Sequence, residues 1–394
     1  MSRFDFAKIE LDRLKEANLL RKLVCIDSPQ ESTVEIQGRQ KVVFCSNNYL
    51  SLADNSKIIE AVTGAMARYG HGAAASRLMS GTMSPHIELE RKLAQFLQKE
   101  AALIFPSGWM ANEAVIRTIA GRGDLVLLDK LDHASIIDAA AGSQAEFRTY
   151  RRNNLARVEK FLASPRFRRK FIITESIFSM DGDTADLKRL VELKNNYDAF
   201  LIVDEAHAFG CLGRTGAGLA EEMGLLDELD IVVATMSKAL GAGGGLVAAD
   251  KLVIDLLINK ARPFIYTTAP TVANCAAALA ALEIVKNEPQ RRDKLRQNVE
   301  YLRTRLNALG LNTGQSQSHI IPVIIGDEKQ TLAVSRRLYE MGFFVPAIRP
   351  PTVPPGTARL RLSMQTGHSK QQIDGLCGAF EKIIAEGLLP TSGD

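Results

Sequence analysis

The chain has 394 residues, a formal net charge of +4 and 46% hydrophobic residues. This composition is typical of a folded globular protein with a large core and about two domains. The small charge and the absence of a long Lys/Arg block argue against a nucleic-acid partner. The five cysteines are scattered without a C-x-x-C pair, so no disulfide framework and no metal site are expected. No apolar run is long enough for a signal peptide or a membrane span, so we expect a cytoplasmic protein without a membrane partner.

Residues 1–50 are expected to form an N-terminal helix and a hairpin. Apolar residues such as Ile9, Leu14 and Leu20 recur near helical spacing over residues 4–24. Two short alternating runs, at residues 34–36 and 42–44, flank a turn at Gly38, which favours a β-hairpin.

Residues 51–285 are expected to form a large α/β domain. Helical segments alternate there with short apolar runs at residues 103–105, 125–128, 171–173, 200–203, 231–234 and 246–249. Such runs suit strands that are buried on both faces. The helices between them imply a mostly parallel sheet with helices on both faces.

Residues 286–394 are expected to form a smaller α+β domain. A charged helix near residues 291–309 precedes a strand at residues 320–325. A further helix, strands near residues 343–345 and 359–363, and a final helix complete it.

Polar residues follow several of the predicted strands, where open α/β sheets bind their ligands. Asp204 and His207 follow the run at 200–203, and Lys238 follows the run at 231–234. A lysine amine can form a Schiff base with an aldehyde cofactor, whose pyridine nitrogen needs an acidic partner. The turn at residues 106–112 exposes backbone N–H groups at a helix N-terminus, which suits a phosphate. Together these features predict a pyridoxal phosphate (PLP) site.

Other motifs in the chain have competing interpretations. Residues 204–207 spell the DEAH box of helicase-type ATPases, but the G-x-x-x-x-G-K-[ST] loop that an ATPase needs is absent. The glycine-rich run at 241–245 precedes a predicted strand, whereas a dinucleotide fingerprint follows one. Residues 181–183 lack the other ligands of a calcium loop. A PLP-type fold without activity is disfavoured by the presence of Lys238.

Seven ordered segments resemble the α-oxoamine synthases, which are fold-type I PLP enzymes. They are residues 46–50, 76–82, 86–90, 132–135, 175–182, 204–207 and the loop around Lys238. The resemblance implies an aminotransferase-like fold and a transferase that joins an amino acid to an acyl thioester with loss of carbon dioxide. It also implies a homodimer, because residues 266–270 resemble the family segment that reaches the partner's cofactor phosphate.

The resemblance assigns roles to individual residues. Lys238 holds PLP and moves protons, and Asp204 pairs with the pyridinium nitrogen. His207 bonds the phenolic oxygen, and His133 stacks on the ring and also faces the substrate. The other expected cofactor contacts are Gly108, Trp109, Glu175, Ser179, Thr235 and Thr268. The other expected substrate contacts are Arg21, Asn47, Arg349, Thr352 and Arg361.

Within the family, residues 347–362 most resemble the branch that condenses L-alanine with a pimeloyl thioester in biotin synthesis, the acyl group being carried by coenzyme A or acyl-carrier protein. The alternatives are glycine C-acetyltransferase and, after it, other α-oxoamine synthases. Asn48, Ser51, residues 73–75, Ser237 and Ala239 depart from the usual family pattern. These departures bear on the choice of acyl substrate.

Overall fold

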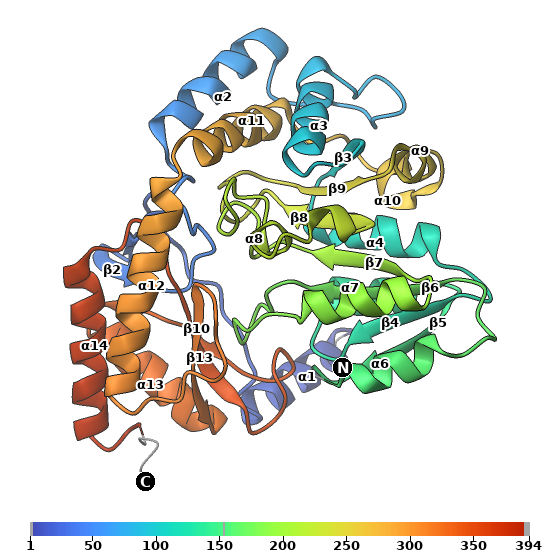
Figure 1. The fold of residues 1–394 in the computed structure, drawn as a ribbon. Coiled ribbons are helices and arrows are strands. Elements are labelled where there is room, and N and C mark those ends of the chain that lie inside the picture. Colours follow the sequence, from blue (N-terminus) through green and yellow to red (C-terminus); the bar gives the residue numbers. More distant parts are fainter. Residues whose placement is uncertain (1–2, 153, 390–394) are drawn as a thin grey trace. The chain divides into compact units, whose positions relative to one another are not determined.

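A computed structural model describes residues 3–152 and 154–389, which divide into two compact units (Figure 1). The larger unit comprises Asn47–Ser179 and Asp183–Lys294. The smaller unit comprises Met1–Ser46, Met180–Gly182 and Leu295–Asp394. The N-terminal segment, expected to be a part of its own, therefore clusters with the C-terminal residues.

The larger unit is built on a seven-stranded sheet in the order β3-β9-β8-β7-β6-β4-β5. Its strands are β3 (Ala101–Phe105), β4 (Leu125–Asp129), β5 (Glu146–Tyr150), β6 (Lys170–Glu175), β7 (Phe200–Asp204), β8 (Ile231–Thr235) and β9 (Gly245–Ala249). Strands β5, β4, β6, β7 and β8 run parallel to one another, and β9 runs antiparallel to both β8 and β3. The predicted mostly parallel α/β fold is confirmed.

Helices cover both faces of this sheet (Figure 1). The helices of the larger unit are α2 (Ser56–Tyr69), α3 (Ser84–Phe96), α4 (Gly108–Ile119), α5 (Ala134–Ala141), α6 (Leu155–Leu162), α7 (Leu187–Asn196), α8 (Leu219–Glu222), α9 (Lys251–Lys260), α10 (Arg262–Ile265) and α11 (Val272–Asn287), with a 3-10 turn at Leu226–Glu228. The apolar side chains of α4, α5, α9 and α10 form one core with alternate residues of the strands, such as Val126, Ile202 and Val233. Burial on both faces explains why these strands are almost continuously apolar.

The strand register brings the polar strand ends to one edge of the sheet. Glu175 at the end of β6 lies opposite Asp204 at the end of β7, and Thr235 ends β8. Because β9 is reversed, it begins at this same edge. Gly245, its first residue, pairs with both Thr235 and Phe105.

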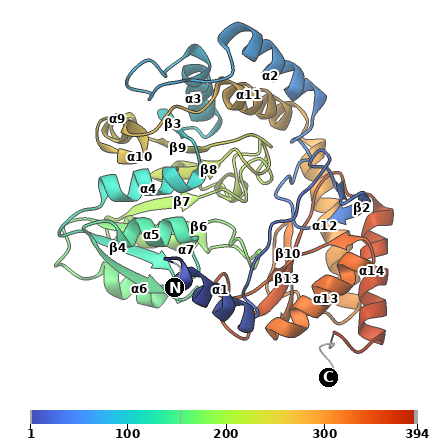
Figure 2. The same ribbon diagram turned by 180° about the vertical axis from the view of Figure 1, so that it is seen from behind.

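The smaller unit contains two three-stranded sheets (Figure 2). One has the order β10-β13-β12, formed by β10 (Ile320–Gly326), β13 (Ala358–Ser363) and β12 (Ala347–Ile348). The other consists of the hairpin β1 (Thr33–Ile36) and β2 (Arg39–Val43) with β11 (Phe343–Phe344) parallel to β2. The helices are α1 (Asp5–Glu16), α13 (Glu328–Glu340) and α14 (Lys370–Ala385), and α12 (Gln290–Ala308) enters the unit from the larger one. The pairing of β11 with β2 joins the N-terminal hairpin to the C-terminal segment.

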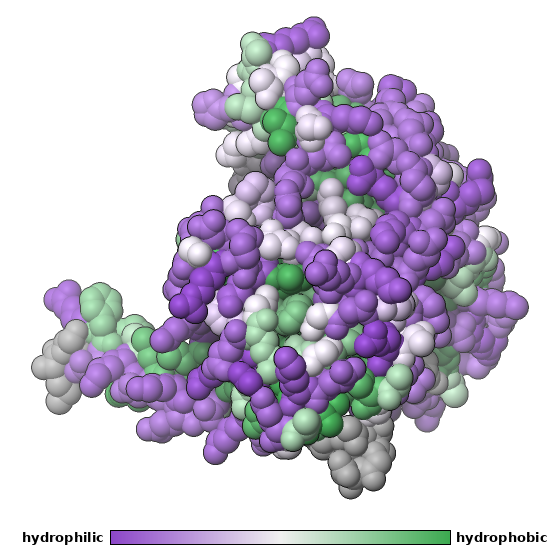
Figure 3. All heavy atoms as spheres, turned by 90° about the vertical axis from the view of Figure 1, so that its left-hand side faces the viewer, coloured by the Kyte–Doolittle hydropathy of each residue, from purple (hydrophilic) through white to green (hydrophobic). Residues whose placement is uncertain are grey.

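Helix α1 is shorter than the sequence pattern predicts. It ends at Glu16 because Asn18 adopts a left-handed conformation with φ 58°, which asparagine tolerates better than most residues. None of its residues is buried. Phe4 and Phe6 are each 71% exposed, and green hydrophobic atoms mark this segment beside the grey N-terminal residues in Figure 3. Helix α1 therefore carries an apolar face that no described part of the chain covers.

We expect Gly245→Ala to lower the thermal unfolding temperature and to weaken the binding of any ligand at the turn that begins α4. A Cβ on Gly245 would lie 2.4 Å from the Ser107 carbonyl oxygen and 2.6 Å from the Gly108 Cα, so the start of α4 must shift. Overpacking of this kind costs roughly 1–3 kcal/mol. The matched control is Gly64→Ala within α2, where a Cβ meets nothing within 4 Å. There the change should leave stability unchanged or raise it by up to about 1 kcal/mol. Calorimetry on both variants distinguishes steric crowding from a general effect of added methyl groups.

Candidate active site

Lys238 begins a hydrogen-bonded chain that passes through His207. Lys238 Nζ lies 2.9 Å from His207 Nε2, and His207 Nδ1 lies 2.7 Å from the Tyr49 hydroxyl. The Tyr49 hydroxyl donates to Asn47 Oδ1 at 3.0 Å. Since the tyrosine proton points to Asn47, His207 Nδ1 donates to the Tyr49 oxygen and Nε2 accepts from the lysine amine. This series of hydrogen bonds holds the lysine amine in a fixed direction beyond the end of β8.

Asp204 and His133 are connected by a second set of hydrogen bonds. Asp204 Oδ2 accepts from Asn112 Nδ2 at 2.8 Å, and the same nitrogen donates to Ser135 Oγ at 3.0 Å. Ser135 Oγ in turn lies 2.8 Å from His133 Nδ1. His133 also precedes α5, where its Nδ1 accepts the backbone N–H of Ser135 as an N-terminal cap.

The two sets belong to one electrostatic site. Burial lowers the pKa of His133, while the Asp204 carboxylate raises it and the Lys238 amine lowers it further. Burial raises the pKa of Glu175 to about 8, and the Asp204 charge adds to this whereas Lys238 and Arg152 oppose it. Glu175 and His133 therefore both lie within electrostatic reach of Asp204 and Lys238.

Glu175 belongs to a group of buried carboxyl side chains at the strand ends. Asp132 Oδ1 accepts the backbone N–H of Glu175 at 3.0 Å, and its Oδ2 accepts that of Asp129 at 2.8 Å. Burial raises the pKa of Asp132 well above its usual range, and the charges of Glu175 and Asp129 raise it further. Glu175 Oε2 is buried and has no hydrogen-bond partner among the described residues. A protonated Glu175 can thus donate to a ligand.

The expected phosphate contacts surround the first turn of α4. Ser107 caps this helix by accepting the N–H of Met110 at 3.2 Å. Thr235 packs beside Gly108, and its hydroxyl donates to the Gly244 carbonyl at 2.8 Å. The Trp109 ring meets the His133 ring edge to face, with centroids 5.9 Å apart.

Two other expected cofactor contacts lie in loops of the larger unit. Thr268 forms an isolated β-bridge with Ser76. Ser179 lies beyond the end of β6, in the loop that the bridge between Ile177 and Thr184 closes.

Four expected substrate residues lie in the smaller unit, and three of them converge. Arg21 donates to Thr352 Oγ1 at 3.4 Å, and Arg349 donates to the Asn18 carbonyl. Burial lowers the pKa of Arg349, and the nearby Arg21 charge adds to this. Arg361, which is buried on β13, donates to Ser363 Oγ at 2.6 Å instead of joining this cluster.

Sequence reasoning missed Tyr49, Asn112, Asp132 and Ser135 as site residues. All four are buried and bond directly to expected site groups. The available signal was their position, since each belongs to one of the polar turns or motifs that follow strands. Their residue types alone are common in capped turns.

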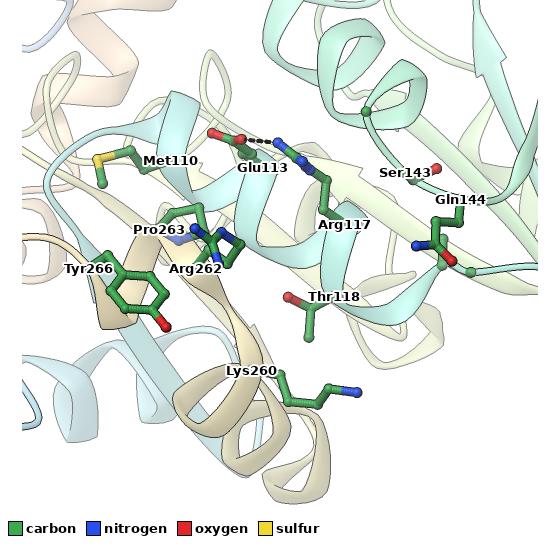
Figure 4. Close-up of a pocket in the computed structure, with 13 residues that line it drawn as sticks. Met110, Glu113, Arg117, Thr118, Ser143, Gln144, Lys260, Arg262, Pro263 and Tyr266 are labelled. Atoms are coloured by element: carbon green, nitrogen blue, oxygen red, sulfur yellow. Dashed lines mark hydrogen bonds and ion pairs between the residues drawn. The ribbon is translucent and has the colours of Figure 1, made fainter.

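A groove of about 570 Å³ lies along α4 and α10 (Figure 4). Three cations line it, Arg117, Lys260 and Arg262, and Glu113 forms an ion pair with Arg117 at 2.6 Å. The Arg262 guanidinium lies over the Tyr266 ring, 4.8 Å from its centroid. None of the expected cofactor or substrate residues is among the described side chains that line this groove.

Within residues 3–152 and 154–389, no His, Cys, Asp and Glu side chains are grouped in a way that could hold a metal ion. None of the helices described is both long and apolar enough to cross a membrane.

The amine, carboxylate, imidazoles and helix N-terminus fit PLP by their chemistry. The lysine can bind an aldehyde, the buried carboxylate can pair with a pyridinium nitrogen, and the first turn of α4 can bind a phosphate. Glu175 Oε2, which has no partner among the described residues, can still form a hydrogen bond with a bound group. Fold and site together define the class as fold-type I PLP-dependent transferases.

Comparison with known proteins narrows this class. The model of the aminotransferase class I and II family matches residues 39–380. An 8-amino-7-oxononanoate synthase of Anaeromyxobacter dehalogenans is 44% identical over 389 residues, covering 99% of this chain and 97% of that protein. A serine palmitoyltransferase from S. paucimobilis, solved with a bound PLP–myriocin aldimine, is 30% identical with a TM-score of 0.92 over 98% of this chain and 99% of that one. The 8-amino-7-oxononanoate synthase structure from Francisella tularensis is 28% identical with a TM-score of 0.77, covering 89% and 99%.

The chain belongs to the aminotransferase class I and II family and, within it, to the α-oxoamine synthases. The resemblance found in the sequence is thereby confirmed.

The raised pKa of Glu175 predicts that the protein without cofactor loses stability as pH rises from about 4.5 to about 8. In this pH range the folded state keeps a proton that the unfolded chain releases, so the free energy of unfolding falls as the pH rises. Glu175→Gln removes the group that titrates. Between pH 4.5 and 8 the unfolding free energy of the variant should therefore fall less than that of the wild type, by on the order of a few kcal/mol. Denaturant titrations at several pH values measure this.

Two other carboxyl groups matter for that experiment, because one limits the expected effect and the other supplies a control. Glu205, whose pKa burial raises to about 7, acts in the same direction, so Glu175→Gln should flatten the pH dependence without abolishing it. Glu283 has a lowered pKa because its carboxylate bonds Lys92. Glu283→Gln should therefore change the stability-against-pH curve only at acidic pH, near and below the usual pKa of a glutamate. Parallel curves for the wild type and Glu175→Gln would contradict the prediction.

Proposed function

We propose that the protein condenses L-alanine with a pimeloyl thioester to give 8-amino-7-oxononanoate, a step of biotin synthesis. A carbon–carbon bond forms between the alanine Cα and the acyl carbonyl carbon. The thiol of coenzyme A or acyl-carrier protein leaves, and the alanine carboxylate leaves as carbon dioxide. The observation that carries the proposal is the Lys238, Asp204, His207 and His133 cluster in a chain that is 44% identical to such a synthase along 99% of its length.

PLP, when bound through its aldehyde to an amine, withdraws electrons from the substrate's Cα. The side chains of the protein then orient and move protons. The buried Asp204 carboxyl group would pair with the ring nitrogen of PLP. Lys238 would hold the aldehyde of PLP and serve as the base at the alanine Cα, and His207, whose Nε2 lies 2.9 Å from Lys238 Nζ, would orient the lysine amine. His133 would stack on the cofactor ring, and Gly108, Trp109, Ser179 and Thr235 would supply its remaining contacts.

Asn47 and Arg361 are proposed to bind the amino acid, with the Arg361 fork on its carboxylate. Arg21, Arg349 and Thr352 are proposed to bind the acyl thioester. Their support is the convergence of these three residues within the smaller unit although more than 300 positions separate Arg21 from the other two. Two guanidinium groups close enough to affect one another suit an anionic ligand such as a terminal carboxylate or a phosphate.

We expect L-alanine with a pimeloyl thioester to give a higher kcat/KM than glycine with acetyl-coenzyme A. Each buried CH₂ of the longer acyl chain contributes about 0.8 kcal/mol, so pimeloyl and acetyl groups should be well separated. Neighbouring chain lengths should differ by only roughly 10-fold to 200-fold. A matrix of amino acids against acyl thioesters, followed by thiol release, measures this, with Lys238→Ala as the inactive control. Faster reaction of glycine with acetyl-coenzyme A would assign the protein as a glycine C-acetyltransferase.

The proposed assembly is a cytoplasmic homodimer with active sites at the subunit interface. Its support is the exposed apolar surface. Helix α1 leaves Phe4 and Phe6 uncovered, and Met79 and Tyr266, which are exposed by 80% and 72%, flank the bridge between Ser76 and Thr268. Contiguous apolar patches of more than a few hundred Å² mark interaction surfaces, and a dimer interface would cover these side chains. In this proposed dimer, Thr268 would bond the cofactor phosphate of the partner subunit.

Mixing two inactive variants tests this arrangement. Thr268→Glu places a carboxylate where the phosphate binds, and Lys238→Ala removes the amine. If Thr268 serves the partner's site, each hybrid dimer has one site with both defects and one intact site, so mixing restores activity to a substantial fraction of the wild-type value. Sedimentation verifies that hybrids form. Hybrids without activity would show that Thr268 acts within its own subunit, and a fully active monomer would exclude the dimer.

A further inference from the structure

Asn112 lies between the two groups that are proposed to flank the cofactor ring. It is on α4 and only 2% exposed. Its side-chain nitrogen carries two hydrogens, and the structure uses both of them, one toward Asp204 Oδ2 at 2.8 Å and one toward Ser135 Oγ at 3.0 Å. A single amide therefore contacts the carboxylate directly and reaches toward His133 through one hydroxyl.

The Ser135 hydroxyl accepts a hydrogen bond from Asn112 and donates one to His133. His133 Nδ1 accepts the backbone N–H of Ser135 at 3.2 Å, so this ring nitrogen carries no proton. Because Ser135 Oγ accepts from Asn112, its own hydrogen is free to donate to the same Nδ1 at 2.8 Å. Two donors on Nδ1 select the neutral ring with its hydrogen on Nε2. The lowered pKa of His133 agrees with this neutral form.

The Asp204 carboxylate is fixed from two sides. Oδ1 accepts the backbone N–H of Ala206 at 2.9 Å, and Oδ2 accepts from Asn112. One donor on each oxygen defines the plane of the carboxylate. Without the amide, Oδ2 and the Ser135 hydroxyl would each lose a donor inside the protein, where an unmade hydrogen bond is costly.

We propose that Asn112 is a positioning residue that sets the carboxylate plane of Asp204 and the ring orientation of His133 through one amide group. The proposal deepens the proposed function and rests on it in one respect, namely that Asp204 and His133 face PLP. An aspartate at position 112 would place a second hydrogen-bond acceptor beside the Asp204 carboxylate, which needs a donor there. An apolar residue would supply no donor at all.

Asn298 supplies the matched control, because it has the same chemistry without a functional partner. It is 3% exposed, and its Nδ2 donates to the backbone carbonyls of Gln365 and His368, both at 3.0 Å. If buried two-donor amides matter only for folding, Asn112 and Asn298 should behave alike. If Asn112 positions Asp204, only its replacement should change cofactor binding.

The experiment is a double-mutant cycle on cofactor affinity. PLP is titrated into the cofactor-free protein while the fluorescence of Trp109, the single tryptophan of the sequence, is followed. Asn112→Leu, which matches the side chain in shape but lacks its donors, should raise the Kd about 10-fold or more, the equivalent of one lost hydrogen bond to a charged group. In an Asp204→Ala background the same change should raise the Kd less than about 3-fold, since the group that Asn112 contacts directly is gone and only its indirect effect on His133 remains.

The outcomes are distinct. An unchanged Kd for Asn112→Leu, or an equal increase in both backgrounds, would overturn the positioning role. Asn298→Leu should lower the unfolding temperature yet leave the Kd unaltered, and a rise in its Kd equal to that of Asn112→Leu would also overturn the role. Should Asn112→Leu fail to fold, Asn112→Ala is measured in the same cycle. A wild-type protein that does not bind PLP at all would instead refute the proposed function.

Discussion

The parallel register of β6, β7 and β8 is the constraint on which the site depends. It sets Glu175 beside Asp204 at the end of adjacent strands and lets the loop after Thr235 carry Lys238 to the same edge. Side chains alternate between the two faces of a strand, so a slip of one residue in β7 would turn Asp204 to the opposite face. The reversed strand β9 contributes differently. Its first residue, Gly245, has no side chain, and the start of α4 can therefore lie directly against it.

The buried charges at this edge are tolerable because each group is held by several partners. Both Asp204 oxygens accept hydrogen bonds, and Asp132 spans two strand ends through two backbone N–H groups. Glu175 differs in that its Oε2 has no hydrogen-bond partner among the described residues and burial raises its pKa to about 8. The site therefore combines fixed groups, which define geometry, with an acid whose charge depends on pH near neutrality.

The strands buried on both faces could be predicted from sequence because burial imposes a continuous apolar pattern, as at residues 200–203 and 231–234. Strand β5 was missed since it lies at the sheet edge and is only half buried, which allows Glu146, Arg148 and Thr149 within it. The two-residue strand β12 is too short to leave any pattern. The extent of α1 was overestimated because a single conformation, that of Asn18, ends the helix where the apolar spacing continues.

Reactive groups of the candidate site could be predicted more readily than the groups that hold them. A lysine or a carboxylate after a buried strand is unusual, and so Lys238 and Asp204 stand out. Asn112, Ser135 and Tyr49 act through hydrogen bonds whose partners are distant in sequence, and an amide or hydroxyl in a turn has many ordinary explanations. Likewise, the approach of Arg349 to Arg21 follows from tertiary structure alone.

The pairing of β2 with β11 has a consequence for the order of events during synthesis. Val42 and Val43 lie beside Phe343 and Phe344, about 300 positions further along the chain. Residues 47–294 have all left the ribosome before this partner strand is made, so the sheet of the larger unit can assemble while translation continues. The N-terminal hairpin meanwhile presents an unpaired edge, and closing so long a loop is slow. The smaller unit is thus completed last, although its N-terminal hairpin is made before the larger unit.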